Sequence, residues 1–257
     1  MLPDKIFGLF YMYGLMIAVG LLACFGVLFY YGKKKKIEEK FIDFIFFNAI
    51  ASIIVGFASA ALFQATYSYI ENPEKGFRLD GGITFIGGLI GGIVTFLVVY
   101  ALFRKRYKTR LFEVVSMAPC CILIAHAFGR VGCFFAGCCY GKETDAWYGI
   151  TFHNAYFAPN GVKLIPTQLI SSVGDFAICG MLLWYASRKP KTGRVASMYM
   201  LLYGVGRFAL EFLRNDYRGS IGVLSTSQII SIVIVAIGAV MYAVVPKLLE
   251  KKNREDS

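Results

Sequence analysis

Seven long apolar runs, separated by short polar or basic stretches, constrain what this chain can fold into. The runs cover residues 7–31, 42–70, 83–103, 111–128, 166–187, 195–213 and 223–246. Each run has about the 20 residues that a helix needs to cross the hydrocarbon core of a bilayer. Because 57% of the residues are hydrophobic and only 17% are charged, a soluble globular protein is excluded. We therefore expect one all-α polytopic membrane domain over residues 1–257, with seven transmembrane helices.

The distribution of lysine and arginine predicts the orientation. Most of the 27 Lys and Arg residues lie in four clusters that follow the first, third, fifth and seventh runs, at 33–40, 104–110, 188–194 and 247–254. Cytoplasmic loops carry the excess of these residues, so we expect the N-terminus outside and the C-terminus in the cytoplasm. The net charge of +11 is thus divided among loops, and no nucleic acid partner is expected.

The segment 131–165 is too polar and too rich in Gly, Asn and Pro to cross a membrane. We expect it to form a loop at the outer face, with short elements of its own. Four glycines should let the chain leave the fourth helix and fold back: Gly129, Gly132, Gly137 and Gly141. The glycines at 81–92 have a spacing that permits close contact between helices, and they would also leave room for acyl chains.

Polar motifs lie at the ends of several apolar runs. The predicted topology places all of these ends on the outer side of the membrane. Tyr13 lies near the outer end of the first run, and "LDGGITFIGGLIGG" (79–92) enters the third run from outside. "HAFGRVGCFFAGCCYG" (126–141) and "YGVGRFALEFLRNDYRG" (203–219) end the fourth and sixth runs on the same side. An active site that faces the outer leaflet of the cell membrane is the simplest account of this convergence.

Two arginines, Arg130 and Arg207, lie at the ends of apolar runs. An ionised arginine within a span costs at least ~2.5–3.5 kcal/mol, so it needs a partner or a polar cavity. Glu211 lies four residues after Arg207 and offers a structural ion pair along one helix face. Arg130 has no carboxylate within one turn, but His126 lies four residues before it. The functional alternative is that both guanidinium groups bind a lipid phosphate bidentately.

These motifs resemble the prolipoprotein diacylglyceryl transferase family, and the resemblance covers nearly the whole chain. "GRVGCFFAGCCYG" (129–141) keeps the Gly–Arg–Gly framework of the family signature. The other similar motifs are "YGLMIAVG" (13–20), "DGGITFIGGLIG" (80–91), "PTQL" (166–169), "GRFALEFLR" (206–214) and "STSQIISI" (225–232). Ordered motifs on a seven-span topology are far more specific than any one of them.

The resemblance implies transfer of the diacylglyceryl group of phosphatidylglycerol to the thiol of a lipobox cysteine in a prolipoprotein, with release of glycerol phosphate and without a cofactor. It implies catalytic roles for Arg130, Arg207 and Glu211. It also implies substrate binding by Arg130, Tyr13, Asp80, Gly129, Gln168 and Gln228. A related transferase with the same lipid donor and another acceptor is one alternative. A redox or structural membrane protein that works through its cysteines is the other.

The chain departs from the family pattern at several signature positions. The histidine of the second motif is Ile86, two asparagines are Cys133 and Ala136, and a glutamate is Cys138. The attacking thiol must lose its proton, and a base with a pKa near neutral would help, so we expect His126 to serve as that base. The alternative is that His126 caps a helix end or hydrogen-bonds a nearby carbonyl.

Three cysteines cluster in the signature segment: Cys133, Cys138 and Cys139. On the outer side of the membrane they can form a disulfide, or they are small packing residues. A direct thiol role with substrate is the second alternative. A zinc site with His126 is the third, but the spacings do not match a C-x₂-C motif and adjacent cysteines rarely bind one metal. No metal is therefore assigned from the sequence.

Overall fold

Helices dominate the computed structural model. It describes all residues except 1–4, 7–9, 80–81, 83, 110, 112–113, 115–116, 189, 191–192, 216–219, 222 and 256–257. Asp80, one of the predicted binding residues, lies outside the described residues. The chain divides into two compact units, one of residues 1–30 with 114–257 and one of residues 31–113.

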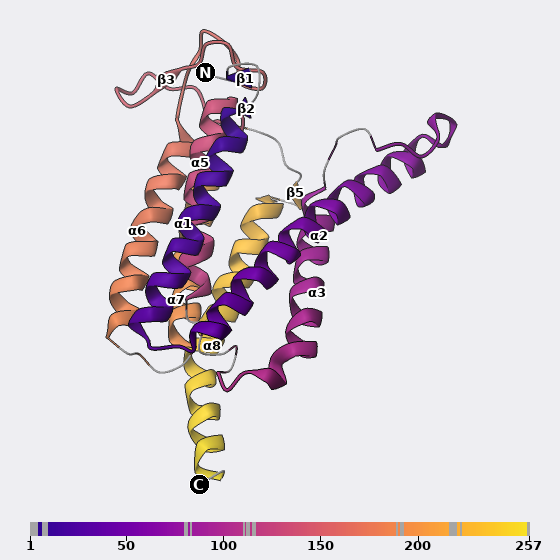
Figure 1. Cartoon of the computed structure of the whole chain (residues 1–257). Coiled ribbons are helices and arrows are strands. Elements are labelled where there is room, and N and C mark those ends of the chain that lie inside the picture. Colours follow the sequence, from indigo (N-terminus) through magenta and orange to yellow (C-terminus); the bar gives the residue numbers. More distant parts are fainter. Residues whose placement is uncertain are drawn as a thin grey trace. The chain divides into compact units, whose positions relative to one another are not determined.

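Each predicted apolar run overlaps one of the long described helices (Figure 1). The helices are α1 (Met12–Lys34), α2 (Glu39–Glu71), α3 (Phe85–Phe103), α5 (Ala118–Ala136), α6 (Thr167–Ser187), α7 (Arg194–Glu211) and α8 (Thr226–Glu255). Short 3₁₀ turns, η1 (Pro73–Lys75) and η2 (Arg104–Arg106), follow α2 and α3. Three antiparallel pairs of short strands complete the described part: β1 (Lys5–Ile6) with β2 (Phe10–Tyr11), β3 (Ile150–Thr151) with β4 (Lys163–Leu164), and β5 (Ser220–Ile221) with β6 (Leu224–Ser225).

Six of the described helices are long and apolar enough to cross a membrane. They are α1, α2, α5, α6, the stretch 86–106 and the stretch 226–246. Their outward side chains are large and apolar, and Leu22, Phe47 and Leu102 are 73%, 66% and 71% exposed, which suits contact with lipid and not with water. The prediction of an all-α polytopic membrane protein is confirmed. Helix α7 has 18 residues and carries three charged side chains, so its length and composition alone do not mark it as a span.

In the unit of residues 31–113, glycines of α3 pack directly on α2. A Cβ added at Gly91 would lie 2.5 Å from Cβ of Ser59, and one added at Gly87 would lie 2.6 Å from Cβ of Phe63. The Ser59 hydroxyl donates a hydrogen bond of 2.9 Å to the Gly87 carbonyl. The predicted close helix contact at these glycines is therefore present.

Replacing Gly91 with alanine should separate α2 from α3, because its Cβ has no room beside Ser59. We expect a loss of about 1–3 kcal/mol in the free energy of unfolding, as for other overpacked sites. Titration with sodium dodecyl sulfate, followed by helix content, measures this loss. Gly26→Ala in α1 is the matched control, since no atom lies within 4 Å of its added Cβ. Equal stability of the two variants would contradict the packing argument.

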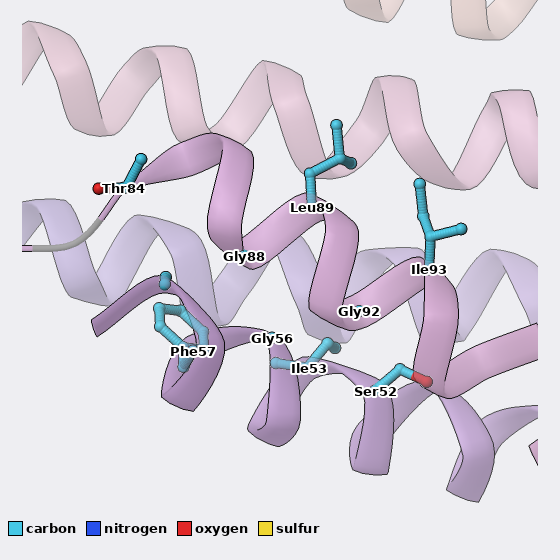
Figure 2. A pocket seen from close by; sticks show the side chains of 10 residues that line it. Ser52, Ile53, Gly56, Phe57, Thr84, Gly88, Leu89, Gly92 and Ile93 are labelled. Atoms are coloured by element: carbon cyan, nitrogen blue, oxygen red, sulfur yellow. The ribbon is translucent and has the colours of Figure 1, made fainter. Parts of the chain in front are cut away.

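An open cavity of about 380 Å³ lies along the same contact between α2 and α3 (Figure 2). It is lined by Ser52, Ile53, Gly56, Phe57, Ala60, Thr84, Gly88, Leu89, Gly92 and Ile93. No charged side chain is among these residues, so the cavity offers no cation to a phosphate. The charged candidates Arg130, Arg207 and Glu211 belong to the other unit.

In the unit of residues 1–30 and 114–257, α1 packs on α5 and α7 packs on α8. A Cβ at Gly20 of α1 would lie 3.1 Å from the Ala125 carbonyl oxygen. A Cβ at Gly204 of α7 would lie 2.6 Å from the Val235 side chain of α8. Helix α6 lies against α5 and also against α7 (Figure 1). Small residues therefore let these helices approach closely, as is common within membranes.

Helix α5 is longer than the sequence predicted. It continues through Gly129 and Gly132 to Ala136, so residues 131–136 are helical and do not belong to the loop. The prediction that Gly129 and Gly132 break the helix was wrong. Gly132 stays helical where α1 packs closely, since its added Cβ would lie 3.1 Å from the Tyr13 ring. The helix ends at Gly137, whose left-handed φ of 71° ends a helix at no steric cost.

The segment after α5 has a small core of its own, as expected for a loop with short elements. Phe152, Ala155, Ala158 and Leu164 are buried together beside the β3–β4 pair. Gly141 donates its N–H to the Ile165 carbonyl at 3.0 Å and ties the start of this loop to the start of α6. An added Cβ at Gly141 would lie 2.6 Å from that carbonyl oxygen, so the position requires glycine.

Candidate functional site

His126 lies in the middle of α5 and pairs with a carboxylate of another helix. Its Nδ1 atom is 2.8 Å from Oδ2 of Asp175 on α6. The Asp175 side chain is only 5% exposed, so its charge needs a partner inside the protein. The alternative that His126 caps a helix end or bonds a carbonyl is therefore wrong. Sequence reasoning missed Asp175, although a lone carboxylate within the apolar run 166–187 is itself a signal of function.

Arg130 extends this contact along α5. Its Nε–H donates a hydrogen bond of 3.2 Å to Nε2 of His126. Since Nδ1 faces a carboxylate and Nε2 accepts from arginine, the hydrogen bonds fit a neutral imidazole with its proton on Nδ1. Asp175, His126 and Arg130 thus form one chain of hydrogen bonds from a buried anion to a cation. Within the described residues, no other hydrogen bond or ion pair engages the Arg130 guanidinium, so its terminal nitrogens can meet a ligand.

Arg207 forms a second charged group on α7. Its Nη1 atom lies 2.8 Å from Oε2 of Glu211, which is the ion pair expected from the i, i+4 spacing. Its Nη2 donates a hydrogen bond of 2.9 Å to the hydroxyl of Ser227 on α8. Nη1 and Oε2 form this ion pair, and both are buried without a hydrogen-bond partner among the described residues. Such atoms favour a further polar group at this position.

Tyr203 connects the two charged groups. It lies on α7, one turn before Arg207, and its ring meets the His126 ring edge-on at 5.7 Å. Tyr199 stacks on Tyr203 at 5.5 Å and supports this ring from the same helix. Arg130 and Arg207 therefore belong to two helices that touch each other through His126 and Tyr203.

The first residues of α6 hold the segment that follows α5. The Thr167 hydroxyl donates to the Cys139 carbonyl at 2.7 Å, and Nε2 of Gln168 donates to the Cys138 carbonyl at 2.7 Å. Both side chains are buried, with 1% and 0% exposure. Gln168 was predicted to bind substrate, and in the structure its amide positions this loop. Its Oε1 atom is buried and has no hydrogen-bond partner within the described part of the chain.

Three thiols gather at this loop. The sulfur atoms of Cys133, Cys138 and Cys139 all lie within 4.8 Å of one another. All three residues carry thiols and none is linked by a disulfide. His126 is not part of the cluster, so the zinc ligand set that included it is not brought together. Contacts with the sulfurs of Cys133 and Cys139, together with burial, raise the pKa of the Cys138 thiol.

The remaining predicted residues have distinct surroundings. Tyr13 packs against Gly132, beside the C-terminal turn of α5. Gly129 has open space where a side chain would stand, next to Arg130. Gln228 and Ser225 cap α8 mutually: the Ser225 N–H donates to Oε1 of Gln228 at 2.9 Å, and the Gln228 N–H donates to the Ser225 hydroxyl at 3.2 Å. The predicted residue Gln228 therefore has a structural role at the start of its helix.

The fold and this site together define a polytopic helical membrane protein with charged and thiol groups held between its helices. The sequence profile that describes prolipoprotein diacylglyceryl transferase matches residues 6–244. The chain belongs to this family.

Curated relatives cover almost the same length. The phosphatidylglycerol–prolipoprotein diacylglyceryl transferase of Clostridium tetani (strain Massachusetts / E88) is 41% identical over 242 residues, which span 93% of this chain and 94% of that protein. The transferase 2 of Clostridium perfringens (strain 13 / Type A) is 39% identical over 93% of this chain and 92% of its own length. The Finegoldia magna protein of the same name is 32% identical over 98% of both chains. The similarity therefore includes both compact units.

Proposed function

We propose that this protein transfers the diacylglyceryl group of phosphatidylglycerol to the thiol of a lipobox cysteine in prolipoproteins. The observation that carries the proposal is the chain from Asp175 through His126 to Arg130, which holds a guanidinium group within the helices of a membrane protein. A phospholipid is the anion that such a cation meets in a bilayer. The relatives in C. tetani and C. perfringens bear the names of the same donor and acceptor.

In this mechanism the phosphate is the leaving group, and Arg130 and Arg207 bind it. Negative charge builds on the phosphate oxygen as the glyceryl carbon is transferred, and guanidinium groups stabilise that charge. The open space beside Gly129 lets the headgroup approach Arg130. Glu211 keeps Arg207 oriented through their ion pair of 2.8 Å. Tyr13 remains a proposed binding residue of this site, and Asp80, which lies outside the described residues, remains a binding residue proposed from the sequence alone.

His126 acts in this proposal by positioning Arg130. Its Nε2 lone pair already accepts a hydrogen bond from Arg130, so taking the acceptor's proton requires that this contact break. Asp175 fixes the tautomer of His126 through Nδ1. The general-base role expected from the sequence thus needs a rearrangement, whereas the positioning role needs none.

The test is transfer by purified protein from radiolabelled phosphatidylglycerol to a lipobox peptide. We expect a lipidated peptide and an equal amount of glycerol phosphate, and a Cys→Ser peptide should remain unmodified. Consumption of the lipid without modification of the cysteine peptide would favour the alternative of a different acceptor. Absence of lipid turnover under every condition would favour the redox or structural alternative.

We also propose the complete topology: α7 crosses the membrane as the sixth of seven spans, the N-terminus and the loop after α5 face outside, and the C-terminus is cytoplasmic. The basic clusters support it, because they follow alternate spans. The active site then faces the outer leaflet of the cell membrane, where exported prolipoproteins arrive.

Reporter fusions should show this orientation directly. A reporter after Ser257 is expected to be active in the cytoplasm, and one inserted near Asn160 is expected to be active outside. Asn160 lies at a turn of the loop, where its side chain bonds the Ala155 backbone, so insertion just after Gly161 (φ 80°) preserves those bonds. Both reporters on one side would mean that an even number of spans separates them and would contradict the topology.

A further inference from the structure

We propose that Cys133, Cys138 and Cys139 form a Zn²⁺ site whose fourth position takes the acceptor thiol. The proposal rests on the proposed function for the identity of that thiol, but the metal site itself does not. Catalytic zinc sites have three protein ligands and one position for water or substrate, and thiolate sulfur is a preferred ligand. The cluster supplies three sulfur ligands. Among the described residues, no histidine or carboxylate belongs to it.

The geometry is close to that of a metal site. Sulfurs bound to a tetrahedral zinc at about 2.3 Å lie about 3.8 Å from one another. The three sulfurs lie within 4.8 Å of one another, so each pair needs to close by about 1 Å at most. Small χ1 rotations supply such a change. The vicinal pair Cys138–Cys139 contributes two of the sulfurs, against the expectation from spacing alone.

The backbone explains why adjacent cysteines converge. Cys139 has a left-handed backbone with φ of 61°, a conformation that costs a residue other than glycine about 1–3 kcal/mol. Such strain persists only where surrounding contacts enforce it, and here Thr167 and Gln168 bind the carbonyls of Cys139 and Cys138. Both hydrogen bonds come from buried side chains, so the thiols are held on a rigid support before any ligand arrives.

Charge favours the site as well. Three thiolates around Zn²⁺ carry a net charge of −1, and Arg130 lies three residues before Cys133 on the same face of α5. An acceptor thiol at the fourth position would therefore lie close to a phosphate held by Arg130. This arrangement brings the nucleophile and the leaving group of the proposed reaction to the same end of one helix.

The chemical step balances without an oxidant or a reductant. The acceptor thiol binds at the fourth position and releases its proton to water, because a thiol that coordinates a metal ion is deprotonated. A sulfur lone pair then forms a bond to the glyceryl methylene carbon as the bond from that carbon to the phosphate oxygen breaks. The bonding electrons leave with glycerol phosphate. No side-chain base is needed, which is consistent with His126 being engaged by Arg130.

The experiment is metal analysis of the full chain purified in detergent with a reductant. We expect about one zinc per chain, and the Co²⁺-substituted protein should show sulfur-to-cobalt charge-transfer absorption. A lipobox peptide should change this spectrum, whereas its Cys→Ser form should not. Removing zinc with a chelator should lower transfer at pH 7 about 30-fold, the ratio of thiol to thiolate for a pKa near 8.5, and added Zn²⁺ should restore it.

Serine variants separate the site from general effects of cysteine loss. Cys133→Ser, Cys138→Ser and Cys139→Ser should each lose the Co²⁺ spectrum, and Cys24→Ala in α1 should keep it, because Cys24 is not part of the cluster. A reduced protein that binds no zinc, or one whose transfer is unaffected by the chelator, would overturn the proposal. So would a Co²⁺ spectrum that the cysteine peptide leaves unchanged. A spectrum that responds to the peptide without any lipid transfer would support the metal site and reject the proposed function.

Discussion

Replacing Arg130 with glutamine is expected to lower diacylglyceryl transfer by about 10²–10³-fold, the loss that follows removal of one donor to a developing anion. The guanidinium nitrogens beyond Nε are not engaged by described residues, so the substitution removes a ligand to the phosphate. Arg130→Lys should recover little of the rate, because lysine lacks the planar fork and the Nε–H that His126 binds. Turnover per folded molecule, with protein measured by size-exclusion chromatography, is the readout.

Arg106→Gln is the matched control for this variant. Arg106 is exposed, lies over the Phe103 ring at 4.8 Å and belongs to the 3₁₀ turn η2. Its loss should leave transfer within about twofold, since exposed charges contribute little. Full activity of Arg130→Gln at a normal membrane level would remove Arg130 from the mechanism.

Replacing His126 with alanine should both destabilise the protein and slow transfer. The Asp175 carboxylate, which is 5% exposed, would lose its hydrogen-bond partner, and leaving such a buried group unsatisfied costs about 1–3 kcal/mol. The double variant His126→Ala with Asp175→Ala should be more stable than His126→Ala alone, because it removes the stranded charge. Equilibrium unfolding in sodium dodecyl sulfate measures this coupling.

Activity separates positioning from proton transfer at His126. His126→Gln keeps an acceptor for the Arg130 Nε–H, so it should retain more activity than His126→Ala if His126 only positions Arg130. The pH dependence of kcat should then be the same in His126→Gln as in the unmodified protein. Equal loss in the two variants, with a changed pH profile, would identify His126 as the base.

Several features followed from local sequence patterns. Hydropathy identified the position of every described helix, because burial in lipid selects apolar side chains over about 20 consecutive residues. The pair of Arg207 and Glu211 was also predictable, since residues four apart lie on one face of a helix. The end of α5 was misplaced because the packing of α1 on Gly132 keeps that glycine helical, and the sequence does not show this contact.

Only the tertiary structure decided which groups meet across the helices. The sequence alone places Arg130 one helical turn after His126, and it places Asp175 within the next apolar run. His126 and Asp175 are 49 residues apart in the chain, so no local pattern shows that they meet. Their contact depends on which face of α6 packs on α5, and hydropathy carries no information about that choice. The same is true of the three thiols: their convergence depends on the left-handed backbone at Cys139 and on hydrogen bonds from Thr167 and Gln168 at the start of another helix. Local spacing predicts contacts within one helix, whereas contacts between helices are set by the packing of side chains that are distant in sequence.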